Sequence, residues 1–255
     1  MHNLKWILTI FFLISHCVAF ASLNPSLHQP SDIIAAIKAN YSQIQTIACR
    51  ISQTRLYGNN KVQSELNLFF KSPDKLYLDY LTPLRQIIIA NGTSCWSYSP
   101  EDNQVEKVDL TGANMIFSPI KLLGIDVLDE LKNTFDLTIK ENEAGNRDAA
   151  TGIVILASPK TGGKVISQIF IAVDPSCWTI SSLKIMGKKG NLISQTLFEN
   201  YQQVNNIWFP LRISAKSLIG KQVIIEDISF HRLKLNAEIL DERFDFVPPE
   251  GMGEK

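Results

Sequence analysis

Residues 66–100, LNLFFKSPDKLYLDYLTPLRQIIIANGTSCWSYSP, constrain the fold of this chain most strongly. The first two runs alternate apolar and polar side chains and are separated by a Ser-Pro-Asp turn. A nearly all-aliphatic run, 86–90, then leads through Asn91-Gly92 into 94–98. Asn-Gly is typical of a type I′ hairpin turn, in which both residues take positive φ. The pattern predicts a curved antiparallel sheet with one strongly apolar face.

Strand-like runs continue on both sides of this segment. Residues 46–57 precede it, 104–109 follow it, and further runs fill the chain from Phe135 onward, separated by Pro, Gly, Asn and Asp. Several of these runs are apolar on both faces, as in 152–156 and 223–225. Such strands must be covered by other segments on both sides or must face an apolar interior. The sequence therefore predicts a mainly β fold with helices (α+β), with about eleven antiparallel strands.

Two regions have helical periodicity instead. Ser31 followed by Asp32 predicts a helix start, and isoleucines at three- and four-residue spacing predict one apolar stripe along a helix over about 32–45. A second helical region covers 115–133. It contains a proline and a glycine, which should break it into short pieces.

The N-terminus has the three-part pattern of a secretory signal peptide over 1–21. Lys5 precedes an apolar run at 6–14, and Ala-Phe-Ala ends the segment. The run is shorter than the roughly 20 residues that span a bilayer. Cys17 is expected to leave with the signal peptide rather than to be acylated, because His16 stands where lipoprotein signals have a small residue.

The mature chain is predicted to have a flexible leader, 22–30, and a single domain, 31–255, because no linker-like or repetitive segment interrupts it. The full sequence has 25 basic and 25 acidic residues, which implies no polyanionic partner and no nucleic acid. Cys49, Cys95 and Cys177 remain after signal removal. Two alternatives are compatible with the sequence: one disulfide with one remaining thiol, or three buried thiols.

Catalytic and cofactor motifs are missing from the sequence. Two histidines remain in the mature chain, His28 and His231, too few for a multi-histidine metal site. No GxSxG, phosphate-binding glycine loop, CxxC or HExxH pattern occurs. Glu226 and Asp227 are neighbours on a predicted strand, so their side chains should point to opposite faces. We therefore expect no enzyme activity, no catalytic residue, no metal and no cofactor.

Several motifs in order resemble the outer-membrane lipoprotein carrier and lipoprotein-sorting family, of the LolA type. They are Ile51-Ser52-Gln53 after the helix, Phe70-Lys71-Ser72-Pro73, Trp96-Ser97-Tyr98-Ser99-Pro100, and Phe244-Asp245-Phe246-Val247-Pro248-Pro249-Glu250-Gly251. Ser72 stands where the family's carriers have an arginine that ties down a lid. The segment around Ile207-Trp208-Phe209-Pro210 is closer to the broader lipoprotein-sorting relatives.

The resemblance implies an incomplete antiparallel β barrel, closed by a helical lid, that encloses a hydrophobic cavity for acyl chains. The predicted cavity wall consists of Leu66, Leu68, Phe70, Leu76, Leu78, Tyr80, Ile88, Trp96 and Tyr98. Leu76, Leu78 and Ile88 match family positions that line the cavity. The predicted lid residues are Ile34, Ile37, Ile116, Phe117, Ile120 and Leu123. An ordinary packed core would have the same composition as such a wall.

The function implied is a periplasmic carrier that moves the acyl chains of lipoproteins, or a related lipid, from the inner towards the outer membrane. Its implied partners are an inner-membrane export complex and an outer-membrane acceptor, and the carrier is expected to be a monomer. Burial of one long acyl chain is worth on the order of 10 kcal/mol, which an apolar wall must match. The alternative is a non-transporting lipid- or lipoprotein-binding domain, or an envelope-stress sensor, of the same fold.

Overall fold

The structure, a computed structural model, describes residues 29–110, 123, 125–141, 152–161, 165–220, 222–247 and 249. The strands are β1 (Thr46–Tyr57), β2 (Asn60–Lys71), β3 (Lys75–Thr82), β4 (Gln86–Asn91), β5 (Ser94–Ser99), β6 (Gln104–Asp109), β7 (Phe135–Glu141), β8 (Ile153–Pro159), β9 (Ile166–Asp174), β10 (Thr179–Gly187), β11 (Leu192–Val204), β12 (Ile207–Ile219) and β13 (Gln222–Leu235). The helices are α1 (Pro30–Tyr41), α2 (Ile125–Thr134) and the short 3₁₀ helix η2 (Asp241–Phe244).

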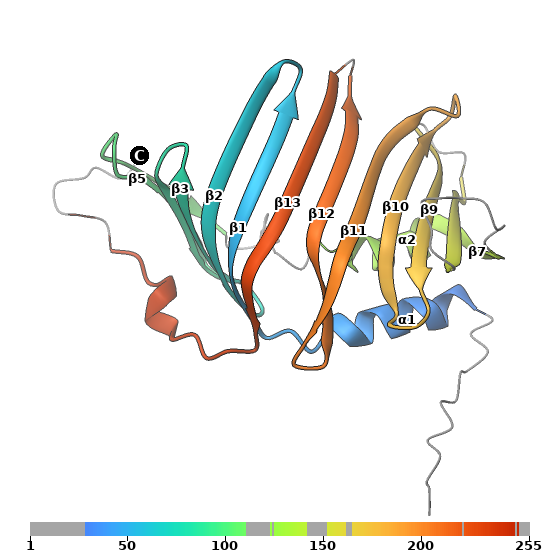
Figure 1. Cartoon of the computed structure of the whole chain (residues 1–255), viewed down its shortest axis with the longest axis horizontal. Helices are drawn as coiled ribbons and strands as arrows, with labels where there is room; N and C mark the ends of the chain where they lie inside the picture. Colours follow the sequence, from blue (N-terminus) through green and yellow to red (C-terminus); the bar gives the residue numbers. More distant parts are fainter. Residues whose placement is uncertain are drawn as a thin grey trace, which may run out of the picture.

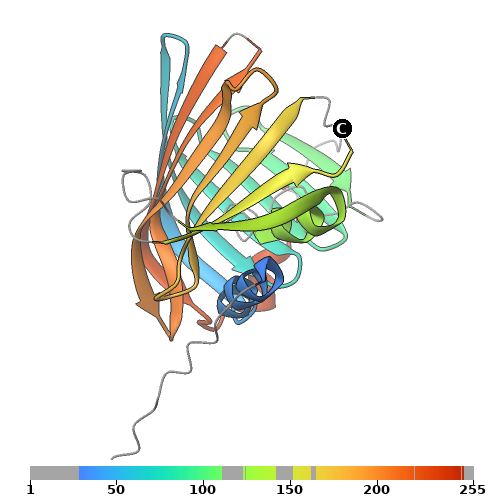
Figure 2. The ribbon, with the colours of Figure 1, turned by 90° about the vertical axis from the view of Figure 1, so that its right-hand side faces the viewer.

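All thirteen strands form one antiparallel sheet, in the order β6-β5-β4-β3-β2-β1-β13-β12-β11-β10-β9-β8-β7. The first and last long strands, β1 and β13, pair at its centre. The sheet bends strongly but does not close, because β6 and β7 remain at its two ends (Figures 1 and 2). The predicted mainly β, antiparallel fold is confirmed. The predicted number of strands, about eleven, was too low, because the sheet has thirteen.

Both α-helices lie on the concave side of the sheet (Figures 1 and 2). The α1 helix contacts β7, β10 and β12 as well as α2. It begins at Pro30, and its N-cap is Gln29 rather than Ser31. Proline at the first helical position has φ already fixed and loses no intrahelical hydrogen bond there, so the helix starts earlier than the capping pattern predicts. It ends at Tyr41, before the predicted end at 45.

Two hairpin turns of the sheet differ in backbone conformation. At Asn91-Gly92 only the glycine has positive φ, +96°, and the Asn91 side chain accepts hydrogen bonds from the backbone of Thr93 and Ser94, at 3.1 and 3.0 Å. The predicted type I′ turn is therefore wrong there. Asn205 and Asn206, between β11 and β12, both have positive φ, at 51° and 64°. That pair has the backbone of a type I′ turn.

Candidate functional site: a helix-covered concave face

The apolar side chains of β2, β3 and β4 share the concave face. Leu68 is paired with Leu78, and Leu78 with Ile88, so these three form one cross-strand row. The rows on either side bring Phe70 next to Leu76 and Leu66 next to Tyr80. Paired residues of antiparallel strands lie on the same face, so seven of the nine predicted wall residues are on one surface.

This surface is almost fully covered. Leu68 is 0% exposed and Leu78 3%, and both belong to the same buried cluster as the apolar side of α1 and the residues Leu128 and Leu131 of α2. Tyr80 and Ile88 are half-buried against that cluster. The apolar rows of β2, β3 and β4 therefore belong to one continuous interior cluster with the buried residues of α1 and α2.

Trp96 and Tyr98 lie on the opposite, convex face, contrary to the sequence prediction. The register of β4 and β5 pairs Ile89 with Trp96 and Ile87 with Tyr98, whereas Ile88 is paired with Ser97. A one-residue difference in register exchanges the two faces of a strand. Both aromatic rings are covered from outside by Phe246, with ring centroids at 6.1 and 5.8 Å.

The predicted lid residues divide into two groups. Ile34 and Ile37 are fully buried, on the side of α1 that joins the interior cluster. Leu123 is also buried in this cluster. Ile116, Phe117 and Ile120 lie outside the described residues.

Two residues in the last turn of α1 attach the helix to the sheet. The Asn40 side chain donates to the carbonyl oxygen of Trp208 at 2.9 Å and accepts from its N–H at 3.0 Å. The ladder between β12 and β13 begins only at Arg212, so Asn40 supplies a partner for the backbone of Trp208 before that ladder starts. The Asn40 side chain thus forms the two backbone hydrogen bonds with Trp208 that a neighbouring strand would otherwise form.

The second attachment is a buried pair of tyrosines. The hydroxyl groups of Tyr41 and Tyr201 lie 3.3 Å apart, and Tyr201 donates to the carbonyl of Ile180 at 2.7 Å. Burial raises the pKa of both phenols far above the ordinary value, so both remain neutral donors at physiological pH. Sequence reasoning missed Asn40 and Tyr201, because their partners are about 160 residues away along the chain.

A polar group lies on the concave face beyond the apolar rows. Gln53 and Arg55 of β1 both donate to the Glu226 carboxylate on β13, and the Arg55 Nη2 contact is 2.6 Å. Asp227 points the other way, towards Arg212 at 2.8 Å and Ser214 at 2.7 Å. The prediction that the two neighbouring carboxylates lie on opposite faces is confirmed. Each has its own charged partner, and they do not form a shared acid–base site.

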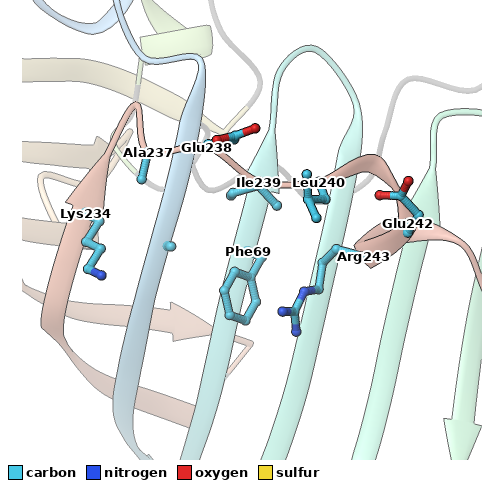
Figure 3. A pocket seen from close by; sticks show the side chains of 9 residues that line it. Phe69, Lys234, Ala237, Glu238, Ile239, Leu240, Glu242 and Arg243 are labelled. Atoms are coloured by element: carbon cyan, nitrogen blue, oxygen red, sulfur yellow. The ribbon is translucent and has the colours of Figure 1, made fainter.

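Two hollows among those lined by described residues bear on the site. One, of about 300 Å³, is lined by Tyr80 with polar residues such as Ser64 and Gln86. The other, of about 630 Å³, lies outside the sheet between the convex face and the chain after β13 (Figure 3). The second hollow could not be predicted from local sequence patterns, because its two sides come from segments far apart along the chain.

The turn with Ser72 has a different role from the one that an arginine would have. Ser72 donates its backbone N–H to the Gln45 carbonyl at 2.8 Å. The neighbouring Lys71 instead holds the C-terminal segment, through the Ile239 carbonyl at 3.2 Å and Asp241 at 2.7 Å.

Reactive side chains outside these contacts have ordinary structural partners. His231 is exposed and lies 3.1 Å from the Ser52 hydroxyl. Cys49, Cys95 and Cys177 are free thiols, and burial raises the pKa of Cys49 to about 12. No group of three or more His, Cys, Asp or Glu suited to a metal is present among the described residues. In the same part of the chain, no helix combines the length and hydropathy that crossing a membrane requires.

A strongly bent antiparallel sheet, with a helix-covered apolar concave face, defines an open, barrel-like class of fold. The same fold occurs in a DUF1329 family protein from Desulfovibrio piger, with a TM-score of 0.56, 14% identity and coverage of 84% of this chain and 95% of that one. It also occurs in a LolA superfamily protein from Nitrosomonas europaea, with a TM-score of 0.50, 13% identity and coverage of 85% and 97%.

The family follows from the sequence match. The model of the family described as outer membrane lipoprotein carrier protein LolA matches residues 42–210, and the chain belongs to this family. An outer-membrane lipoprotein carrier protein of Shewanella halifaxensis is 33% identical over 132 residues, which cover 51% of this chain and 58% of the relative, less than two thirds of its length. One from Chromobacterium violaceum is 24% identical over 220 residues, covering 86% and 85%.

Proposed function

We propose that this protein is a periplasmic carrier that binds the acyl chains of lipoproteins, or of a related lipid, and moves them from the inner towards the outer membrane. In this proposal residues 1–21 are a cleaved signal peptide, 22–30 a leader, and the remainder one domain that acts as a monomer. An inner-membrane export complex would supply the cargo and an outer-membrane acceptor would receive it. Membership of the lipoprotein carrier family supports this proposal.

The observation that carries the proposal is the continuous apolar interior that α1 shares with the concave face of the sheet. The helix places Ile33, Ile34 and Ile37 in the interior, all at 0% exposure. Full burial of an isoleucine side chain is worth about 1.5–3 kcal/mol, so the three together contribute about 5–9 kcal/mol. One acyl chain contributes on the order of 10 kcal/mol. A cargo chain can therefore take the place of the α1 stripe at little net cost.

In this mechanism α1 is the lid, and Asn40 and Tyr41 are its latch. Both latch residues lie in the last turn of the helix and bond to Trp208 and Tyr201. The N-terminal part of α1 can then swing outward while the last turn stays attached. This latch would serve the purpose of the lid-fastening arginine whose position Ser72 occupies.

The test is native mass spectrometry of the protein isolated from periplasm. We expect bound acylated species, and we expect Leu78→Glu and Ile88→Glu to abolish their retention, because a carboxylate would enter the apolar wall. The control is Ile225→Glu, which makes the same change on the convex face, where Ile225 pairs with Leu56 and Lys216. All three variants should remain folded by circular dichroism.

Retention of cargo in both wall variants would contradict the proposed cavity. A second measurement separates transport from simple binding: cargo-loaded protein is mixed with outer-membrane vesicles, and the transfer of lipoprotein is followed. Stable binding without transfer would support the alternative, a non-transporting binding or sensor domain of the same fold.

A further inference from the structure

The chain after β13 forms a strap, residues 236–247, that crosses the convex side of the sheet. It follows the segment 42–210 that the family model matches. Beneath it lies the hollow of about 630 Å³, within the range of small-ligand sites. The hollow is lined by Ala48, Phe69 and Lys234 of the sheet and by Ala237–Leu240, Glu242 and Arg243 of the strap (Figure 3).

The hollow exists because a small residue lies between two large ones. Ala48 is the cross-strand partner of both Lys234 and Phe69. The sheet surface beneath the hollow therefore has only a methyl group between two long side chains. The strap cannot fill the gap, since it is attached on either side of it. Thr46 donates to the Ala237 carbonyl at 2.6 Å, and Phe244 is fully buried farther along.

Two cations face this hollow without carboxylate partners among the described residues. The head groups of Lys234 and Arg243 lie on the Phe69 side of the strap, whereas the carboxylates of Glu238 and Glu242 are turned away from it (Figure 3). The Arg243 guanidinium lies 4.5 Å from the centre of the Phe69 ring, which fixes its position.

Neighbouring lysines show that carboxylate pairing is available on this side of the molecule. Lys71 and Lys75 both pair with Asp241, at 2.7 and 3.1 Å. Asp241 therefore attaches the strap to the sheet through Lys71 and Lys75. Lys234 and Arg243 have no such carboxylate partner among the described residues.

We propose that this pocket binds a small organic anion. Its phosphate or carboxylate group pairs with Arg243, the positive charge of Lys234 lies at the other end of the pocket, and the apolar part of the ligand lies against Ala48, Phe69 and Ile239. Ion pairing supplies the specificity for the anion, and the aromatic and aliphatic lining selects against free inorganic ions. This site is on the opposite face of the sheet from the proposed acyl cavity, and it does not depend on the carrier function.

The test is calorimetric titration of the purified protein with 1-naphthyl phosphate. Inorganic phosphate and 1-naphthol are titrated separately, because they represent the anionic group and the apolar body of that ligand. We expect naphthyl phosphate to bind at least about tenfold more tightly than either half. Lys234→Met and Arg243→Met should each weaken binding by about three- to tenfold, since both cations are exposed and screened. Ala48→Phe should abolish binding by filling the floor. Lys216→Met, an exposed lysine elsewhere on the convex face, should change nothing.

Three results would overturn the proposal. Equal affinity for inorganic phosphate would indicate an adventitious ion only. Unchanged binding in Ala48→Phe and in both cation variants would place the probe elsewhere. Loss of binding in Leu78→Glu would place it in the acyl cavity, so failure of this site and failure of the carrier proposal give different results.

Discussion

Replacing Asn40 with alanine should loosen α1 and leave the sheet intact. The change removes two hydrogen bonds to Trp208, of 2.9 and 3.0 Å, and leaves a backbone N–H and a carbonyl without these partners. Each hydrogen bond contributes about 1 kcal/mol net, so the loss of the two should cost about 2 kcal/mol. At 1.4 kcal/mol per factor of ten, this is a roughly 30-fold increase in the population with the helix end detached.

Hydrogen exchange with mass spectrometry measures this population directly. Amides of α1 should exchange about 30-fold faster in Asn40→Ala, whereas amides of β1 and β2 should change little. The matched control is Gln43→Ala, because Gln43 lies just after α1 and its side chain donates to the Ala39 carbonyl of the helix, at 3.1 Å, and not to the sheet. Equal protection of α1 in wild type and Asn40→Ala would refute the latch, as would an equal effect of Gln43→Ala.

Two further predictions concern titration. The Ser214 hydroxyl and then Arg212 lower the pKa of Asp227, so its contribution to stability is present above about pH 4 and is lost as pH falls through the lowered pKa. Urea unfolding of Asp227→Asn should show lower stability than wild type at pH 7, and the difference should disappear as the pH falls below the lowered pKa of Asp227; a difference that stays constant with pH would exclude this pairing. Burial raises the pKa of the Cys49 thiol from 9.0 to about 12, so iodoacetamide at pH 8 should label it about a thousandfold more slowly than in the urea-unfolded chain; rapid labelling of the folded protein would contradict its burial.

Local sequence patterns were sufficient to predict which segments are strands and which side chains share a face within one strand. Leu66, Leu68 and Phe70 alternate along β2, and the alternation on β3 matches them, so their common surface could be predicted. The order of the motifs also indicated the family, which the model match over 42–210 confirms. These features are local, because the period of a strand is a property of a few consecutive residues.

Which segment lies against each face of the sheet depends instead on contacts between distant parts of the chain. Trp96 has the same alternation as a concave-face residue, yet the β4–β5 register pairs it with Ile89 and places it under Phe246 on the convex side. Asn40 has the appearance of an exposed helical residue, yet it completes the backbone bonding of Trp208. Register between strands and contacts between distant segments depend on the packing of the whole chain, which no local period specifies.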